Sequence, residues 1–190
     1  MYEVHSQTRR CVMIAILGAL AFLLMFLEFP VIPIVSYLKL DFSDVPVLIG
    51  TLLDGPVTGI MIAVVKCLLH GLVHGFAPVE FLGLGADFCS SLALILPFAW
   101  SFRRFKTVKK AMWFGGVSAT ILLTVLMTIF NYYVLTPAYM SMFAWHPSLP
   151  IKELMLVGVL PFNLLKGALI SLVFAIVVVH LRHNKRFNLN

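Results

Sequence analysis

Long apolar runs dominate this chain, and short polar or charged segments separate them. The runs cover residues 11–38, 45–79, 81–100, 111–135 and 154–181. A helix needs about 20 residues to cross the hydrocarbon core of a bilayer, whereas a barrel strand needs only about 10. The lengths of the runs therefore predict membrane-spanning helices rather than barrel strands.

Basic residues gather at the ends of the apolar runs and predict the topology. Arg9 and Arg10 precede the first run, five lysines and arginines lie within residues 103–110, and Arg182, Lys185 and Arg186 follow the last run. The positive-inside rule places all three clusters in the cytoplasm. Both termini are then cytoplasmic, and an even number of crossings must separate the first cluster from the second.

Only three apolar runs lie between those two clusters, so one run must contain two helices. The run 45–79 is too long for one span and holds the turn signal Asp54-Gly55-Pro56. Division there predicts an all-α membrane protein with six transmembrane helices in one domain, residues 1–190. The expected limits are about 11–30, 44–53, 56–76, 81–101, 111–135 and 154–181.

The composition agrees with a membrane protein and excludes several other classes. Of 190 residues, 61% are hydrophobic and 12% charged, and the mean hydropathy is +1.02. The net charge of +6 lies at helix ends rather than on a soluble face, so we expect no nucleic-acid partner. Cys11, Cys67 and Cys89 are scattered singly and predict neither a redox pair nor a zinc site.

Three polar residues lie deep in the last two predicted helices and indicate a binding pocket. A charge at the centre of a spanning helix costs roughly 2.5 to 3.5 kcal/mol, so Lys166 needs a partner or a function. Asn163 shares its helix face at i,i+3 spacing. Asn131 ends a stripe of threonines at 120, 124 and 128 on the preceding helix, although such stripes commonly serve helix packing. Together these residues predict a polar pocket that faces outward.

A second polar face is formed by Lys66, His70 and His74, which recur every four residues. Two histidines at this spacing are compatible with a metal or haem site, but no further ligand motif accompanies them, and we expect no metal. Pairing with the carboxylates Asp87 or Glu80, or a place along the same outward cavity, is favoured.

The segment "YLKLDFSDVP", residues 37–46, alternates polar and apolar side chains before the second predicted helix. Ser43 or Asp44 followed by Pro46 fits a helix start. The same alternation suits a lid over a ligand with aromatic and polar parts. The residues alone leave both interpretations open.

Motifs for chemistry are absent from the chain. It has no G-x-x-x-x-G-K-[ST] loop for nucleotide phosphates and no recognisable catalytic triad, so we expect a non-enzymatic protein whose ATP, if any is used, is hydrolysed by other subunits.

Several segments resemble the riboflavin-specific S components of energy-coupling factor (ECF) transporters. The resemblance rests on six helices and on the small-residue pair Ala15 and Ala19, "LKLDFSD" from Leu38, "NYYVL" from Asn131 and "GVLPFNLLKG" from Gly158. It implies a subunit of the bacterial cell membrane that captures riboflavin outside with high affinity. A module of one membrane coupling protein and two ATPases would then drive delivery.

The resemblance also implies residue roles. Asn131, Asn163 and Lys166 would bind the flavin ring system, and the segment Leu40, Asp41, Phe42 and Ser43 would form part of the lid. Asp87 and Glu80 are the candidates for the ribityl hydroxyls, and Ala15 and Ala19 would dock on the coupling protein. Riboflavin is then a transported ligand, and no cofactor is expected.

Three alternatives stay open at this point. One is an S component for another vitamin or for flavin mononucleotide (FMN). Another is a stand-alone proton-coupled carrier that uses Lys66, His70 and His74. The third is a membrane enzyme with a histidine-ligated metal or haem.

Overall fold

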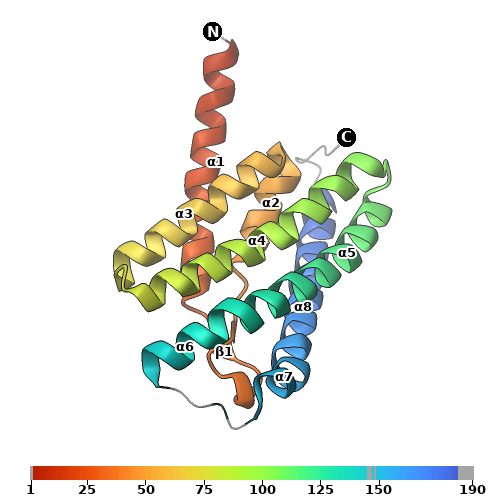
Figure 1. Ribbon diagram of the computed structural model, residues 1–190. Coiled ribbons are helices and arrows are strands. Elements are labelled where there is room, and N and C mark those ends of the chain that lie inside the picture. Colours follow the sequence, from red (N-terminus) through yellow and green to blue (C-terminus); the bar gives the residue numbers. More distant parts are fainter. Residues whose placement is uncertain (1, 145–146, 148, 184–190) are drawn as a thin grey trace.

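A computed structural model describes residues 2–144, 147 and 149–183. Lys185 and Arg186 of the predicted C-terminal basic cluster lie outside these residues, as does the side chain of Arg182. Helices make up most of the described chain (Figure 1). In order, the elements are α1 (Tyr2–Met25), β1 (Phe29–Pro30), η1 (Pro33–Val35), β2 (Lys39–Leu40), α2 (Asp44–Asp54), α3 (Pro56–His74), α4 (Pro78–Arg104), α5 (Val108–Phe130), η2 (Asn131–Leu135), α6 (Thr136–Phe143), α7 (Ile151–Leu154), η3 (Met155–Val159) and α8 (Leu160–His183).

Among the described residues, five helices are long and apolar enough to cross a membrane. Two of them are composite, because α5 continues through η2 into α6, and α7 continues through η3 into α8. The sixth predicted helix is α2, which has 11 residues and a length of about 16 Å at 1.5 Å per residue. The prediction of a six-helix membrane protein is confirmed.

The predicted division of the second apolar run is also confirmed. α2 ends at Asp54 and α3 begins at Pro56, with Gly55 between them at φ 95°. Glycine adopts this left-handed conformation without the steric cost of a side chain, and proline fits the first turn of the new helix. The chain therefore reverses within one residue.

The predicted limits of the first and the fifth helix are wrong. The first helix begins at Tyr2 and ends at Met25, not at residue 30, because the chain turns into the strand β1 that contains Pro30. The fifth helix does not end at residue 135 but runs on to Phe143 through Pro137. Pro137 follows the π-helical segment η2, whose wider turns relieve the clash of the proline ring with the preceding turn.

The last helix also has a π-helical segment shortly before a proline. Its π-helical segment η3 ends at Val159, two residues before Pro161, as η2 ends at Leu135, two residues before Pro137. π-helical turns are frequent at functional sites. Asn131 opens η2, and Asn163 lies in the first turn of α8 after η3.

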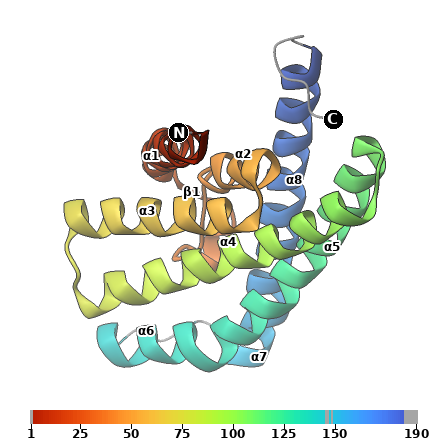
Figure 2. The ribbon, with the colours of Figure 1, turned by 90° about the horizontal axis from the view of Figure 1, so that it is seen from above.

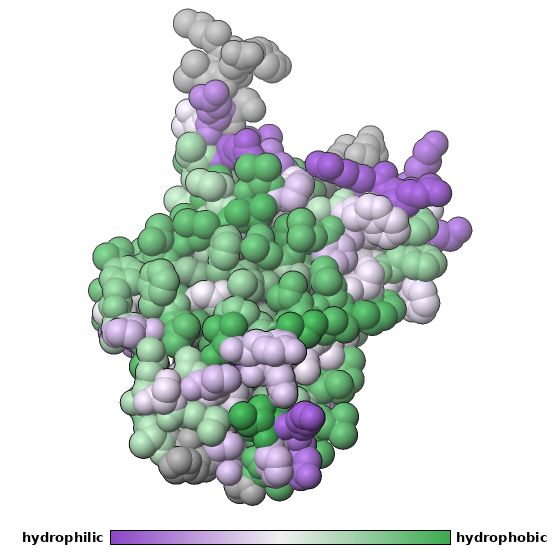
Figure 3. All heavy atoms as spheres, in the orientation of Figure 1, coloured by the Kyte–Doolittle hydropathy of each residue, from purple (hydrophilic) through white to green (hydrophobic). Residues whose placement is uncertain are grey.

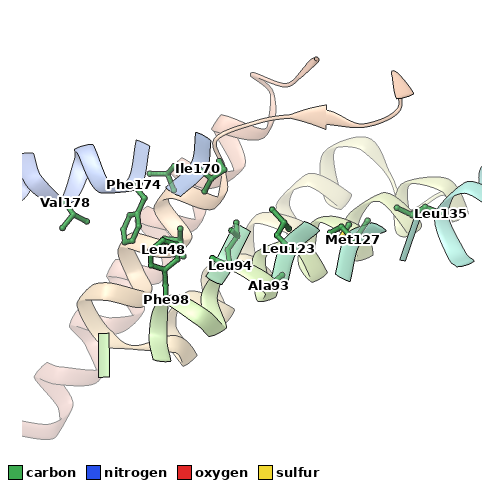
Figure 4. Close-up of a cluster of buried hydrophobic side chains, with 13 residues drawn as sticks. Leu48, Ala93, Leu94, Phe98, Leu123, Met127, Leu135, Ile170, Phe174 and Val178 are labelled. Atoms are coloured by element: carbon green, nitrogen blue, oxygen red, sulfur yellow. The ribbon is translucent and has the colours of Figure 1, made fainter. Parts of the chain in front are cut away.

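The largest apolar core lies where α2, α4, α5 and α8 meet (Figure 4). Phe98 of α4 and Phe174 of α8 are both fully buried and pack edge to face, with ring centroids 5.1 Å apart. Such aromatic pairs add stability beyond the area that they bury. This core holds together the helices that carry the polar residues described below.

The surface shows a green apolar band below a purple polar end (Figure 3). The polar end lies over part of α1 and over the connection between α4 and α5, near the described end of α8 (Figures 1 and 3). The described starts and ends of the chain thus lie at one end of the bundle, as an even number of crossings requires. The strand pair β1–β2 and helices α6 and α7 lie at the opposite end.

Candidate functional site

A buried lysine on α3 joins three elements through its ammonium group. Lys66 Nζ lies 2.8 Å from Asp44 Oδ1, 2.8 Å from Ser43 Oγ and 3.0 Å from Asp87 Oδ2. The side chains of Lys66 and Asp44 are 0% and 1% exposed. Charges buried this deeply are tolerated only when paired and hydrogen-bonded. The expected pairing of this polar face with Asp87 is confirmed.

Asp44 lies between two lysines. Its Oδ1 also accepts a hydrogen bond from Ser91 Oγ at 2.5 Å, whereas its Oδ2 lies 3.8 Å from Lys166 Nζ. Lys166 Nζ is equally far, 3.8 Å, from Asp41 Oδ2. These distances exceed the 2.7–2.9 Å typical of a charge-assisted hydrogen bond. The ammonium of Lys166 is thus held between two carboxylates without a close bond to either.

Lys166 points into a cavity of about 470 Å³ between the loop before α2 and the helices α3, α4, α5 and α8. This volume lies within the range of small-molecule binding sites. The lining mixes carboxylates, amines, an amide, aromatic rings and thioethers. Its residues are Met25, Glu28, Tyr37, Leu38, Lys39, Asp41, His70, His74, Glu80, Gly83, Leu84, Ala86, Asp87, Ser90, Met127, Leu135, Tyr139, Phe162, Asn163 and Lys166.

The two predicted amides occupy different positions. Asn163 lines the cavity and donates its Nδ2 hydrogen to the Val159 carbonyl at 2.8 Å. Asn131 does not line the cavity, although Met127 and Leu135, one turn away on either side, do. The side chain of Asn131 is fully buried, Nδ2 donates to the Met127 carbonyl at 2.8 Å, and Oδ1 has no hydrogen-bond partner among the described residues.

Two of the three threonines before Asn131 form hydrogen bonds within their own helix. Thr120 and Thr124 donate to the carbonyls of Gly116 and Thr120, four residues earlier in α5. This back-bonding satisfies the hydroxyls within their own helix. Thr128 Oγ1 is buried and has no hydrogen-bond partner among the described residues, and none of the three threonines lines the cavity.

Of the predicted lid segment from Leu40 to Ser43, Asp41 lines the cavity and the other three residues do not. Leu40 is fully buried and pairs with Phe29 across the two-stranded sheet. Asp41 lines the cavity and accepts the backbone N–H of Ser43 at 2.7 Å. Phe42 is partly buried against the main core. Ser43 is the residue before α2, as predicted. Its hydroxyl accepts a hydrogen bond from the Lys66 ammonium and does not cap the helix.

Sequence patterns did not indicate the two tyrosines of the site. Tyr37, before β2, and Tyr139, on α6, line the cavity with ring centroids 5.4 Å apart. The Tyr37 hydroxyl lies 3.2 Å from Thr136 Oγ1, and burial is the main cause that raises the pKa of Tyr37. The helix was expected to end at residue 135, so Tyr139 was not placed near the site.

Two histidines of α3 also line the cavity. His70 and His74 stack with ring centroids 4.1 Å apart, and both line the cavity together with Glu80. Among the described residues, no group of three or more His, Cys, Asp or Glu side chains is arranged to hold a metal ion. His70 and His74 of the second polar face thus line the same cavity as Asn163 and Lys166, whereas Lys66 does not.

Ala15 and Ala19 lie on α1, and neither lines the cavity. Both are exposed, as are their apolar neighbours Ile16 and Leu20, whereas Gly18 packs against Val65 of α3. The small residues at 15 and 19 therefore do not serve an internal helix contact and are accessible to another chain.

Fold and site together define a multi-pass membrane protein with a polar cavity for a small molecule inside a helical bundle. The model of the family "ECF transporter, substrate-specific component" matches residues 9–178. The chain belongs to the substrate-specific components of ECF transporters, proteins of the bacterial cell membrane.

Similar proteins cover nearly the whole chain. The riboflavin transporter RibU of Staphylococcus aureus (strain TCH60) is 38% identical over 170 residues, 89% of this chain and 88% of that protein. The riboflavin transporter FmnP of Bacillus subtilis (strain 168) is 34% identical over 184 residues, 93% of each. A solved structure described as the S component of a bacterial ECF transporter superposes with a TM-score of 0.80 at 35% identity, covering 95% of this chain and 99% of that one.

Proposed function

We propose that this chain captures riboflavin at the outer face of the membrane and passes it to an ATP-driven coupling module. The observation that carries the proposal is the buried pair of polar groups at the cavity, Asn163 and Lys166, set among aromatic and apolar side chains. Two similar proteins are named riboflavin transporters, which supports riboflavin as the ligand of this chain. The high affinity and the partner ATPases belong to this proposal.

The chemistry of the cavity suits the isoalloxazine ring. Its pyrimidine edge carries carbonyl acceptors and one N–H donor, which an ammonium and an amide oxygen can satisfy. Lys166 has no close bond to release, because both neighbouring carboxylates are 3.8 Å away. The oxygen of Asn163 makes no hydrogen bond with a described residue, since only its Nδ2 is bonded. Tyr37, Tyr139 and Phe162 would cover the ring faces.

Asn131 would take part after a small adjustment of the cavity wall. Its unpaired Oδ1 is fully buried between Met127 and Leu135, which both line the cavity. A buried acceptor without a donor costs about 1–3 kcal/mol, and a ligand N–H would remove that cost. In the same scheme Asp41, Asp87 and Glu80 accept hydrogen bonds from the ribityl hydroxyls, and Leu40, Phe42 and Ser43 hold the lid.

The charges of the cavity favour riboflavin over FMN. Four carboxylates line it, those of Glu28, Asp41, Glu80 and Asp87, against the two ammonium groups of Lys39 and Lys166. Lys39 is already paired with Glu28. A phosphomonoester would add about two negative charges to this site, and like charges at close range disfavour binding.

Titration of riboflavin into the detergent-purified protein, followed by quenching of flavin fluorescence, tests the proposal. We expect stoichiometric quenching by riboflavin and weaker binding of FMN. Lys166→Ala and Asn163→Ala should each weaken binding roughly tenfold or more, the usual effect of losing a buried hydrogen bond to a ligand. The exposed Lys106→Ala is the matched control and should bind like the unchanged protein.

Absence of quenching by a monodisperse, helical protein would reject riboflavin and direct the search to other vitamins. Coupling is tested separately in proteoliposomes. Uptake should need the coupling module and ATP. Uptake by this chain alone that an uncoupler abolishes would instead establish a proton-coupled carrier.

A further inference from the structure

A second, larger groove lies on the side of the helical bundle, between α5 and α8. The two helices pack against each other and cross at an angle in both ribbon views (Figures 1 and 2). Between them is a groove of about 910 Å³ that shares no lining residue with the cavity described above. Small residues, Gly116 on α5 and Ala168 and Ala175 on α8, form its floor, and larger apolar side chains form its walls.

The groove ends at a basic segment. Lys109 lines it, and Trp113, 64% exposed, lines it one turn further along α5. Four more cations stand in the same connection, Arg103, Arg104, Lys106 and Lys110, and the sequence has no acidic residue between Asp87 and Glu153. None of these five cations forms an ion pair with a described residue.

We propose that this groove binds one anionic phospholipid, with the phosphate at Lys109 and an acyl chain along the floor between α5 and α8. Basic pockets between transmembrane helices on the cytoplasmic side are typical sites for anionic lipid headgroups. Trp113 lies where an indole ring favours the boundary between headgroups and hydrocarbon.

The length of the groove matches one leaflet. Its lining on α5 extends from Lys109 to Ile121, which is 12 residues or about 18 Å along the helix. Half of a hydrocarbon core of about 30 Å is about 15 Å, so a single acyl chain reaches the inner end of the groove. Gly116 lets α5 and α8 approach closely at the groove, since a Cβ there would lie 3.2 Å from Ser171 Cβ.

An anionic lipid explains the charge and the apolar floor together. A neutral lipid would satisfy the floor but leave Lys109 and its neighbours without a counter-charge. A free anion would satisfy the lysine but leave the apolar length unused.

Native mass spectrometry of the full chain with retained lipids tests the proposal without any flavin. Phosphatidylglycerol and phosphatidylcholine with identical acyl chains are added in turn, and the fraction of protein carrying one lipid gives each affinity. We expect preferential retention of phosphatidylglycerol. Lys109→Ala should weaken its retention about fivefold, the effect of one lysine at an anionic surface. Ala175→Phe fills the floor and should weaken retention of both lipids.

Two matched variants distinguish lipid binding in the groove from a general attraction of the protein to lipid. Lys110→Ala removes a neighbouring charge that does not line the groove, and Ala19→Phe makes the same enlargement at an exposed position on α1. Both should retain lipid like the unchanged chain. Circular dichroism and size-exclusion chromatography verify folding, and Ala168→Phe, at an exposed position in the groove, replaces Ala175→Phe if that variant misfolds. Equal retention of the two lipids, an equal effect of Lys110→Ala, or no effect of filling the groove would each overturn the proposal.

Discussion

Lys66 Nζ lies 2.8 Å from Asp44 Oδ1, and neither side chain reaches solvent. The pair joins the middle of α3 to the first residue of α2, and Asp44 in turn faces Lys166 on α8. The position of the cavity lysine is therefore tied to a charge pair in another part of the bundle. Breaking this pair should affect stability first and binding second.

We expect Lys66→Met to lower the free energy of unfolding by about 3–5 kcal/mol, because it removes the close ion pairs of Asp44 and Asp87 and leaves Asp44 only Lys166, 3.8 Å away. Thermal unfolding of the ligand-free protein in detergent measures the change. Lys39→Met is the control, since the Lys39–Glu28 pair is 46% and 39% exposed and such pairs contribute about 1 kcal/mol or less. Adding Asp44→Asn to Lys66→Met should restore part of the loss. Equal shifts for the two lysine variants would show that burial does not set the strength of the Lys66 pair.

Replacing Asn131 should weaken riboflavin binding while changing stability little. Asn131→Leu removes one hydrogen bond to the Met127 carbonyl but also the unpaired buried Oδ1, so the unfolding free energy should change by less than about 1 kcal/mol. Riboflavin affinity, measured by fluorescence quenching, should fall tenfold or more if this oxygen accepts a ligand hydrogen bond. A variant that binds riboflavin normally would remove Asn131 from the site.

The sequence was informative wherever a signal was local. Asp54-Gly55-Pro56 marked the turn between α2 and α3, and the i,i+3 spacing of Asn163 and Lys166 placed both on the buried face of α8. The four-residue spacing of Lys66, His70 and His74 likewise placed all three on the polar side of α3. These inferences need only the period of a helix.

What the sequence did not reveal depends on contacts between distant segments. Asp44 had the pattern of a helix start, and nothing local indicated that it would meet Lys66, 22 positions later, and Lys166. The fifth helix was expected to end at residue 135, and the π-helical turns before Pro137 allow it to carry Tyr139 to the cavity. A residue's role in such cases is fixed by packing rather than by its neighbours in sequence.

The exposed alanines of α1 predict a separation of docking from binding. Ala15→Trp or Ala19→Trp should abolish co-purification with the coupling module, because a large side chain prevents close approach of helices at a small-residue face. Riboflavin binding by the isolated chain should be unchanged, since neither position lines the cavity. Ile129→Trp, at an exposed apolar position on α5, is the control and should still co-purify. Normal assembly of both alanine variants would place the docking face elsewhere.

Gly158 allows a close contact that we expect to hold the proposed lid, residues 40–43, over the cavity. A Cβ at this position in η3 would lie 2.6 Å from Val35 Cγ1, and Val35 is fully buried and β-branched, so its side chain cannot swing aside. Gly158→Ala must therefore displace the η1 segment, which leads into the lid through Tyr37. Overpacking of this kind costs about 1–3 kcal/mol. We expect the cost to appear as faster release of bound riboflavin, measured by stopped-flow displacement, with little change in the association rate. Gly85→Ala is the matched control, because a Cβ there meets no atom within 4 Å and should leave release unchanged. If Gly158→Ala lowers thermal stability while release stays as slow as in the control, the contact between Val35 and η3 supports the fold and does not hold the lid.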